Sequence, residues 1–226
     1  MTSFSGSDGI RWHPVSVIEK YSSSQVQYAR GRREVPMSRR MALPPRAALT
    51  GDLLRMLFRE PEGGVIEDQG NGVVTAGMMN LALVLTGSGG HPLAPGRAVF
   101  GVGSDPGGFD REQVSLSRVL GEESGRSWYR PMDPGYPWVP RPGVIEGQAT
   151  FTESEACFAW HEWGWGTGPG RPVPHHSLRG CYGGEQPVMM NRRAHPAGYG
   201  TKEAGVAWVF RTEITIGLHT IVSLTG

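Results

Sequence analysis

Glycine and proline interrupt this sequence too often for long helices. The chain has 34 glycines and 18 prolines among 226 residues, which is roughly twice their usual combined share of about 12%. Proline breaks the interior of a helix and glycine weakens it. An all-α fold is therefore effectively excluded.

Short apolar runs after residue 90 predict strands. These runs alternate with polar residues and are bounded by glycine and proline. They lie at 97–103, 114–120, 144–151, 155–163 and 205–216. We expect a mainly β fold, an antiparallel β-sandwich or barrel with one or two short helices and an extended N-terminal arm.

Two helices are predicted from apolar spacing and capping residues. Thr50 can cap a helix over 51–59, and Thr75 can cap a second one that runs through Leu85 and that Gly87 would end. In the second helix we expect one apolar face to be buried in the core. That face consists of Met78, Met79, Leu81, Ala82 and Leu85.

The first 48 residues differ from the rest, which we treat as one β-sandwich body over 49–226. Prolines interrupt them, and only Val15, Val17 and Ile18 indicate a strand. Such a segment orders only on another surface, either this protein's body or a neighbouring subunit. Its arginines suit ion pairs at interfaces, with nucleic acid as the alternative partner. They include Arg30, Arg32, Arg33, Arg39 and Arg40.

Two long inserts, 121–143 and 164–204, are rich in glycine, proline and aromatic residues. We expect loops of this length to be irregular and to contact partners. Tryptophan is enriched both in cores and at interfaces. We therefore expect Trp138, Trp163 and Trp165 to anchor these loops at subunit contacts.

Charge and cysteine content narrow the class of protein. The formal net charge is +1 and the isoelectric point about 7.9, without the basic excess of a nucleic-acid coat. No apolar run reaches the ~18 residues of a membrane span, and no secretion signal opens the chain. We expect synthesis in the cytoplasm, no membrane partner, and free thiols at Cys157 and Cys181, although one bridge is the alternative.

Metal and cofactor signatures are sparse. The sequence has no GxGxxG fingerprint before a helix and no GxxxxGK[ST] loop. The carboxylates of Asp105 and Asp110 flank a turn but lack further oxygen ligands for Ca²⁺. Cys157 and His161, together with His175, His176 and Cys181, could supply ligands for Zn²⁺, but the spacing of Cys157 and His161 on a strand disfavours chelation. We predict no metal and no cofactor.

Glycan chemistry is the main alternative from another class. Glu153, Glu155 and Glu162 could supply paired carboxylates for glycan cleavage, and Trp163 and Trp165 could line a sugar-binding cleft. A buried Glu162 would exclude its catalytic use. No nucleophile stands at a recognised spacing, so we predict no catalytic residue.

Several short motifs resemble a known family. They are Asn71-Gly-Val-Val-Thr-Ala-Gly77, Val99-Phe-Gly-Val-Gly-Ser-Asp105, and Ala149-Thr-Phe151 followed by Glu155-Ala156 and Glu162, with a closing strand from Trp208 to Ile216. This pattern resembles a domain of tailed-bacteriophage structural proteins, found in tail-fibre, collar and baseplate-associated chains. The resemblance implies a β-sandwich without catalytic residues.

We therefore expect a non-enzymatic virion structural protein. It would assemble in multiple copies in the tail, collar or baseplate region, and its partners would be other virion proteins and copies of itself. Within the virion, capsid decoration or a head-to-tail position is the alternative. From other classes, the alternatives are a carbohydrate-binding module and a glycan hydrolase at a tail tip.

Overall fold

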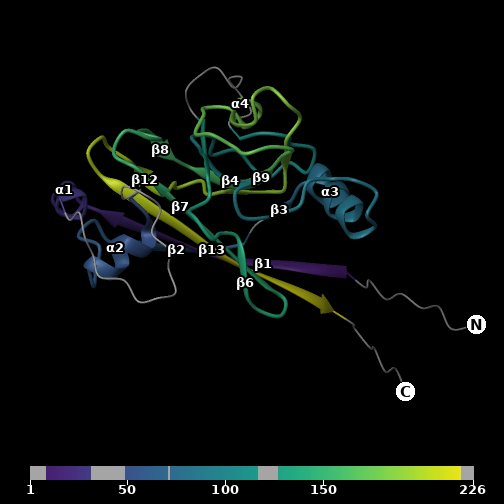
Figure 1. The fold of residues 1–226 in the computed structure, drawn as a ribbon, viewed down its shortest axis with the longest axis horizontal. Helices are drawn as coiled ribbons and strands as arrows, with labels where there is room; N and C mark the ends of the chain where they lie inside the picture. The colour runs from purple at the N-terminus through teal and green to yellow at the C-terminus, as the bar shows by residue number, and fades with distance from the viewer. Residues whose placement is uncertain (1–8, 32–48, 71, 117–126, 220–226) are drawn as a thin grey trace, which may run out of the picture.

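The computed structural model describes residues 9–31, 49–70, 72–116 and 127–219 (Figure 1). These residues form thirteen strands and four helices, and every strand pairing is antiparallel. Two sheets face each other across a shared apolar core. The predicted mainly β fold is confirmed, and the architecture is a sandwich rather than a closed barrel.

The first sheet, sheet I, has the strand order β2-β1-β13-β7-β6. Its centre is the long antiparallel pair of β1 and β13, which stays in register from Gly9 opposite His219 to Tyr21 opposite Ala207. The bounds are β1 Gly9–Tyr21, β2 Val65–Gln69, β6 Trp138–Arg141, β7 Val144–Phe151 and β13 Ala207–His219.

Strand β1 corrects the predicted N-terminal arm. Residues 9–21 lie inside sheet I, between β2 and β13, and helix α1 (Ser23–Gly31) follows directly. Residues 9–31 therefore form a strand and a helix rather than an extended arm, and of the two surfaces expected to order them it is the protein's own body that does so. The order of this segment comes from the rest of the chain: β13 supplies its backbone hydrogen bonds, and Ile18 is buried in the core. Residues 1–8 and 32–48 lie outside the described residues.

The second sheet, sheet II, has the order β3-β11-β9-β4-β5, with β10 also pairing with β9. Its bounds are β3 Gly72–Val73, β4 Ala98–Gly103, β5 Ser127–Pro131, β9 Glu162–Thr167, β10 Val188–Met189 and β11 Asn191–Ala194. A separate two-stranded sheet joins β8 Ala159–Trp160 to β12 Gly200–Thr201.

Strand predictions succeed where the local pattern is strong. The strand over 144–151 is confirmed in full as β7, and 97–103 and 205–216 correspond to β4 and β13. The strand over 155–163 is wrong at its start, because residues 153–156 form a turn and Ala156 has a positive φ of 51°. Residues 114–116 are not a strand, and 117–120 lie outside the described residues.

The two inserts are more ordered than expected. The described part of 121–143 contains β5 and β6, and 164–204 contains most of β9, three further short strands and helix α4 (Leu178–Cys181). Strands of two to four residues have too short a pattern to predict locally, because their stability comes from the partner strand.

The core between the sheets is dominated by aromatic side chains. Phe100 of β4 and Phe210 of β13 meet across the sandwich with ring centroids 4.6 Å apart. The other buried aromatic residues of this cluster are Phe151, Trp160, Trp163, Trp165, Tyr199 and Trp208. Helices α1 and α2 (Gly51–Leu57) cover the outer face of sheet I, and α4 covers that of sheet II.

Candidate functional site

Helix α3 (Thr75–Leu85) has its apolar face on the outside. The predicted range of this helix is confirmed, but the predicted burial is wrong. Its buried residues are Gly77 and Asn80. The exposed fractions of its apolar side chains are Met78 45%, Met79 61%, Leu83 36% and Leu85 73%. We call these four residues the α3 surface.

Two residues that sequence reasoning overlooked attach α3 to the body. At Gly77 a Cβ atom would overlap the main-chain oxygen of Met190, so only glycine allows this close approach. The Asn80 side chain binds His91 twice: Nδ2 donates to the carbonyl oxygen at 2.9 Å, and Oδ1 accepts from the main-chain N–H at 2.7 Å. Gly77 and Asn80 thus face inward, the α3 surface is left in solvent, and Leu81 and Val84 are half-buried.

The start of α3 also differs from its prediction. Val74, not Thr75, occupies the N-cap position, and no side chain caps the helix. The Thr75 hydroxyl instead donates to Glu112 Oε1 at 2.6 Å. A glycine and an asparagine three residues apart within an apolar helix were the signal that could have revealed the inverted orientation.

The predicted interface residues divide into three groups: those outside the described residues, those on the surface, and those buried in the core. Arg32, Arg33, Arg39 and Arg40 lie outside the described residues. Arg30 lies on the surface of α1, where its guanidinium forms an ion pair with Glu153. Trp138 of β6 is 47% exposed, and its indole N–H donates to Glu146 Oε2 at 3.0 Å. Arg30 and Trp138 therefore remain accessible to a partner in the isolated chain.

Trp163 and Trp165 are wrong as interface residues, because both are 0% exposed. They lie on β9, between β4 and β11, and alternate with glycine, so both indoles point into the sandwich. The intervening Gly164 and Gly166 face the opposite side, where Asn191 and Leu178 approach too closely for a Cβ atom.

The burial of Trp163 and Trp165, and that of Glu162, excludes the alternative glycan-binding and glycan-cleaving roles of these residues. A sugar cleft lined by Trp163 and Trp165 does not exist, since neither side chain reaches solvent. Glu162 is also 0% exposed, and its Oε2 accepts a hydrogen bond from Arg192 Nε at 2.6 Å. It cannot serve as the catalytic carboxylate of a glycan hydrolase. Glu155 forms an ion pair with Arg130.

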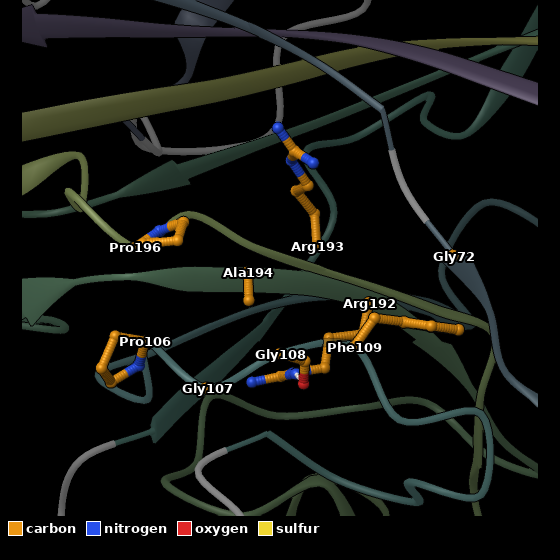
Figure 2. Close-up of a pocket in the computed structure, with 9 residues that line it drawn as sticks. All are labelled: Gly72, Pro106, Gly107, Gly108, Phe109, Arg192, Arg193, Ala194 and Pro196. Carbon is orange, nitrogen blue, oxygen red and sulfur yellow. Dashed lines mark hydrogen bonds between the residues drawn. The ribbon is translucent and has the colours of Figure 1, made fainter.

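A pocket of about 380 Å³ lies beside β11 (Figure 2). Its two charged lining residues, Arg192 and Arg193, extend to opposite sides of the strand. Arg192 is 1% exposed and binds Glu162, Asp105 Oδ2 at 3.3 Å and the Gly108 carbonyl at 2.5 Å. The other lining residues are Gly72, Pro106, Gly107, Gly108, Phe109, Ala194 and Pro196.

Arg193 is also occupied. It binds Asp68 with both Nε and Nη2, at 2.9 and 2.8 Å, and the Tyr199 hydroxyl donates to the same carboxylate at 2.7 Å. Burial of Asp68 opposes its ionisation, but hydrogen bonds from Arg193 and Tyr199 outweigh that effect and lower the pKa of Asp68. Both charged groups of the pocket are therefore engaged in structural pairs, which leaves no free charge in its lining to orient a ligand.

The two cysteines are free thiols, as predicted. Cys157 is exposed, whereas Cys181 is buried and its burial raises the pKa of the thiol to about 12. Across the described residues, no three histidine, cysteine, aspartate or glutamate side chains gather in a group that could hold a metal ion. The turn at Asp105 is closed by its own Oδ1, which accepts the Gly107 N–H at 2.8 Å.

In comparisons with known proteins, no family model, no curated protein and no solved structure matches the chain. The resemblance to phage structural proteins therefore depends on the short motifs alone. No helix in the described ranges has the length and apolar character to cross a membrane.

Proposed function

We propose that this protein is a non-enzymatic structural protein of a tailed-bacteriophage particle, in its tail, collar or baseplate region, and that copies of it assemble through the α3 surface. The observation that carries the proposal is the inverted helix, with Asn80 inside and Leu85 outside. Soluble proteins rarely expose contiguous apolar side chains unless these bind a partner.

The composition around α3 favours a second copy as that partner. The segment from 72 to 96 contains no aspartate, glutamate, lysine or arginine. An uncharged apolar surface is best matched by another such surface, because burial of an unpaired charge against it is unfavourable. The α3 surface of a second copy meets that condition, and symmetric oligomers use such matched patches.

The free energy gained by burial of the α3 surface is modest for one contact but sufficient for assembly through repeated contacts. Full burial of an exposed leucine or methionine side chain contributes about 1.5–3 kcal/mol, so the α3 surface contributes roughly 3–6 kcal/mol per copy at its exposed fractions. Loss of rotational and translational freedom opposes each association. Repeated contacts in a ring or shell add avidity, which suits a virion component.

The phage assignment is supported by the motifs. Those motifs lead into α3 and lie on β4, at the end of β7 and on β9, which are the elements that build the sandwich. A structural role also agrees with the charged groups of the pocket, all of which are paired.

Analytical ultracentrifugation tests assembly directly. We expect the wild-type chain to form oligomers as its concentration rises, and the double variant Met79→Lys/Leu85→Lys to stay monomeric. Val114→Lys is the matched control, because Val114 is 67% exposed and lies outside the α3 surface; it should assemble like the wild type. A wild-type chain that stays monomeric at every concentration contradicts the proposal, and immunogold labelling of phage particles tests the virion location.

A further inference from the structure

The two ends of the described chain meet in a projecting two-stranded ribbon. Strand β2 pairs with β1 only from Val15 to Glu19, and β7 pairs with β13 only as far as Thr215. Beyond these limits, residues 9–12 of β1 pair with residues 216–219 of β13. In Figure 1, the described ends of β1 and β13 run toward the end of the molecule where both termini leave.

The outer edge of the ribbon can be assigned residue by residue. In an antiparallel strand, the backbone groups of alternate residues point to opposite neighbours. On β1 the even-numbered residues point away from β13, because Lys20 N–H donates to the Gly64 carbonyl at 3.0 Å and the Pro14 carbonyl accepts from Gly70 N–H at 3.2 Å. Residues 10 and 12 therefore direct their N–H and carbonyl groups outward.

Within the described residues, nothing pairs with this edge. Strand β2 ends at Gln69, opposite Val15, and Gly70 reaches only Pro14. An open edge is a template for strand addition. A two-stranded ribbon without a third strand is also marginally stable in water. The outer edge of β1 therefore offers backbone groups to which another strand can pair, which would stabilise the ribbon.

We propose that the outer edge of β1, at residues 10–12, pairs antiparallel with the same edge of a second copy of this chain. Two identical edges run in opposite directions present each N–H opposite a carbonyl, so residue 10 of one copy faces residue 12 of the other and the pair exchanges about four hydrogen bonds. The inference rests on the proposed function, since it requires copies that associate.

The position of the ribbon agrees with a second copy as the occupant. Figure 1 places the ribbon and α3 toward the same end of the long axis of the molecule. A copy that contacts the α3 surface thus approaches the end that carries the open edge. Strand addition supplies directional backbone bonds, whereas the α3 surface supplies apolar burial.

Proline substitution tests the edge without breaking the ribbon. Ile10→Pro and Trp12→Pro each remove one outward N–H, whereas the odd-numbered residues make the bonds to β13. Pro14 already occupies an even position of the same strand. In analytical ultracentrifugation, we expect each proline variant to raise the dissociation constant of the oligomer at least tenfold. Ile10→Val and Trp12→Phe keep the N–H and should assemble within twofold of the wild type.

Amide hydrogen exchange of the unsubstituted chain provides a test that does not depend on the proline variants folding. We expect the amides of residues 10 and 12 to exchange at least tenfold more slowly in the oligomer than in monomeric Met79→Lys/Leu85→Lys. Equal protection in that monomer would mean that the chain covers its own edge, and would overturn the inference.

The outcomes separate the two proposals. A wild-type oligomer whose residue 10 and 12 amides exchange as fast as in the monomer overturns the strand pairing and leaves the α3 assembly standing. So does a folded proline variant that assembles like the wild type. A wild-type chain that never associates overturns both.

Discussion

Loss of Arg192 should strongly destabilise this fold. Its guanidinium is 1% exposed and lies between Glu162, which is 0% exposed, and Asp105. Arg192→Met keeps a long side chain of similar reach but removes the positive charge. Glu162 then stays in the interior but loses its ion pair with Arg192.

The expected cost follows from the burial of this pair. Removal of one partner from a buried ion pair destabilises by about 3–5 kcal/mol, because the remaining charge is uncompensated. For a chain of this length, each kcal/mol lowers the melting temperature by about 2–4 °C, so the expected decrease is roughly 6–20 °C. The double variant Arg192→Met/Glu162→Gln should recover part of this loss, since it leaves no buried charge at Glu162.

Urea unfolding followed by tryptophan fluorescence measures the free energy of unfolding of each variant. Arg171→Met is the control, because Arg171 is exposed and its loss should change stability by less than about 0.5 kcal/mol. The reasoning fails if Arg192→Met costs less than about 1 kcal/mol, or if the double variant is less stable than the single one.

Three further predictions concern other parts of the molecule. Gly77→Ala should detach α3 and destabilise by about 1–3 kcal/mol, because the new Cβ meets a main-chain carbonyl; calorimetry that shows no loss would contradict the close packing. The hydrogen bond from Arg30 lowers the pKa of Glu153, so this pair stabilises the fold above the usual glutamate pKa and loses that effect as the pH falls through the lowered value. Arg30→Ala should therefore raise the pKa of Glu153 in an NMR titration, and an unchanged pKa would refute the pairing. In the native protein, iodoacetamide should modify Cys157 and leave Cys181 intact, as mass spectrometry would show; equal labelling would contradict the burial of Cys181.

Local sequence determined the elements that carry a strong pattern of their own. Strand β7 follows alternation between turns, α2 begins at the Thr50 cap, whose hydroxyl oxygen accepts from Leu53 N–H, and α3 has the predicted range. Propensity, periodicity and capping act over a few residues, so they are readable without a partner. Strand β1 was readable only in part, because it is ordered by β13, which lies nearly two hundred residues later in the chain.

The orientation of each apolar face was decided by the tertiary structure. Alternation places Trp163 and Trp165 on one face of a strand, but only the packing of two sheets turns that face inward. The apolar spacing of α3 predicts a helix, yet the close approach at Gly77 and the two hydrogen bonds of the Asn80 side chain to His91 turn the α3 surface outward. A pattern along the chain specifies which side chains share a face; whether that face meets the core or solvent depends on surfaces that distant residues bring to it.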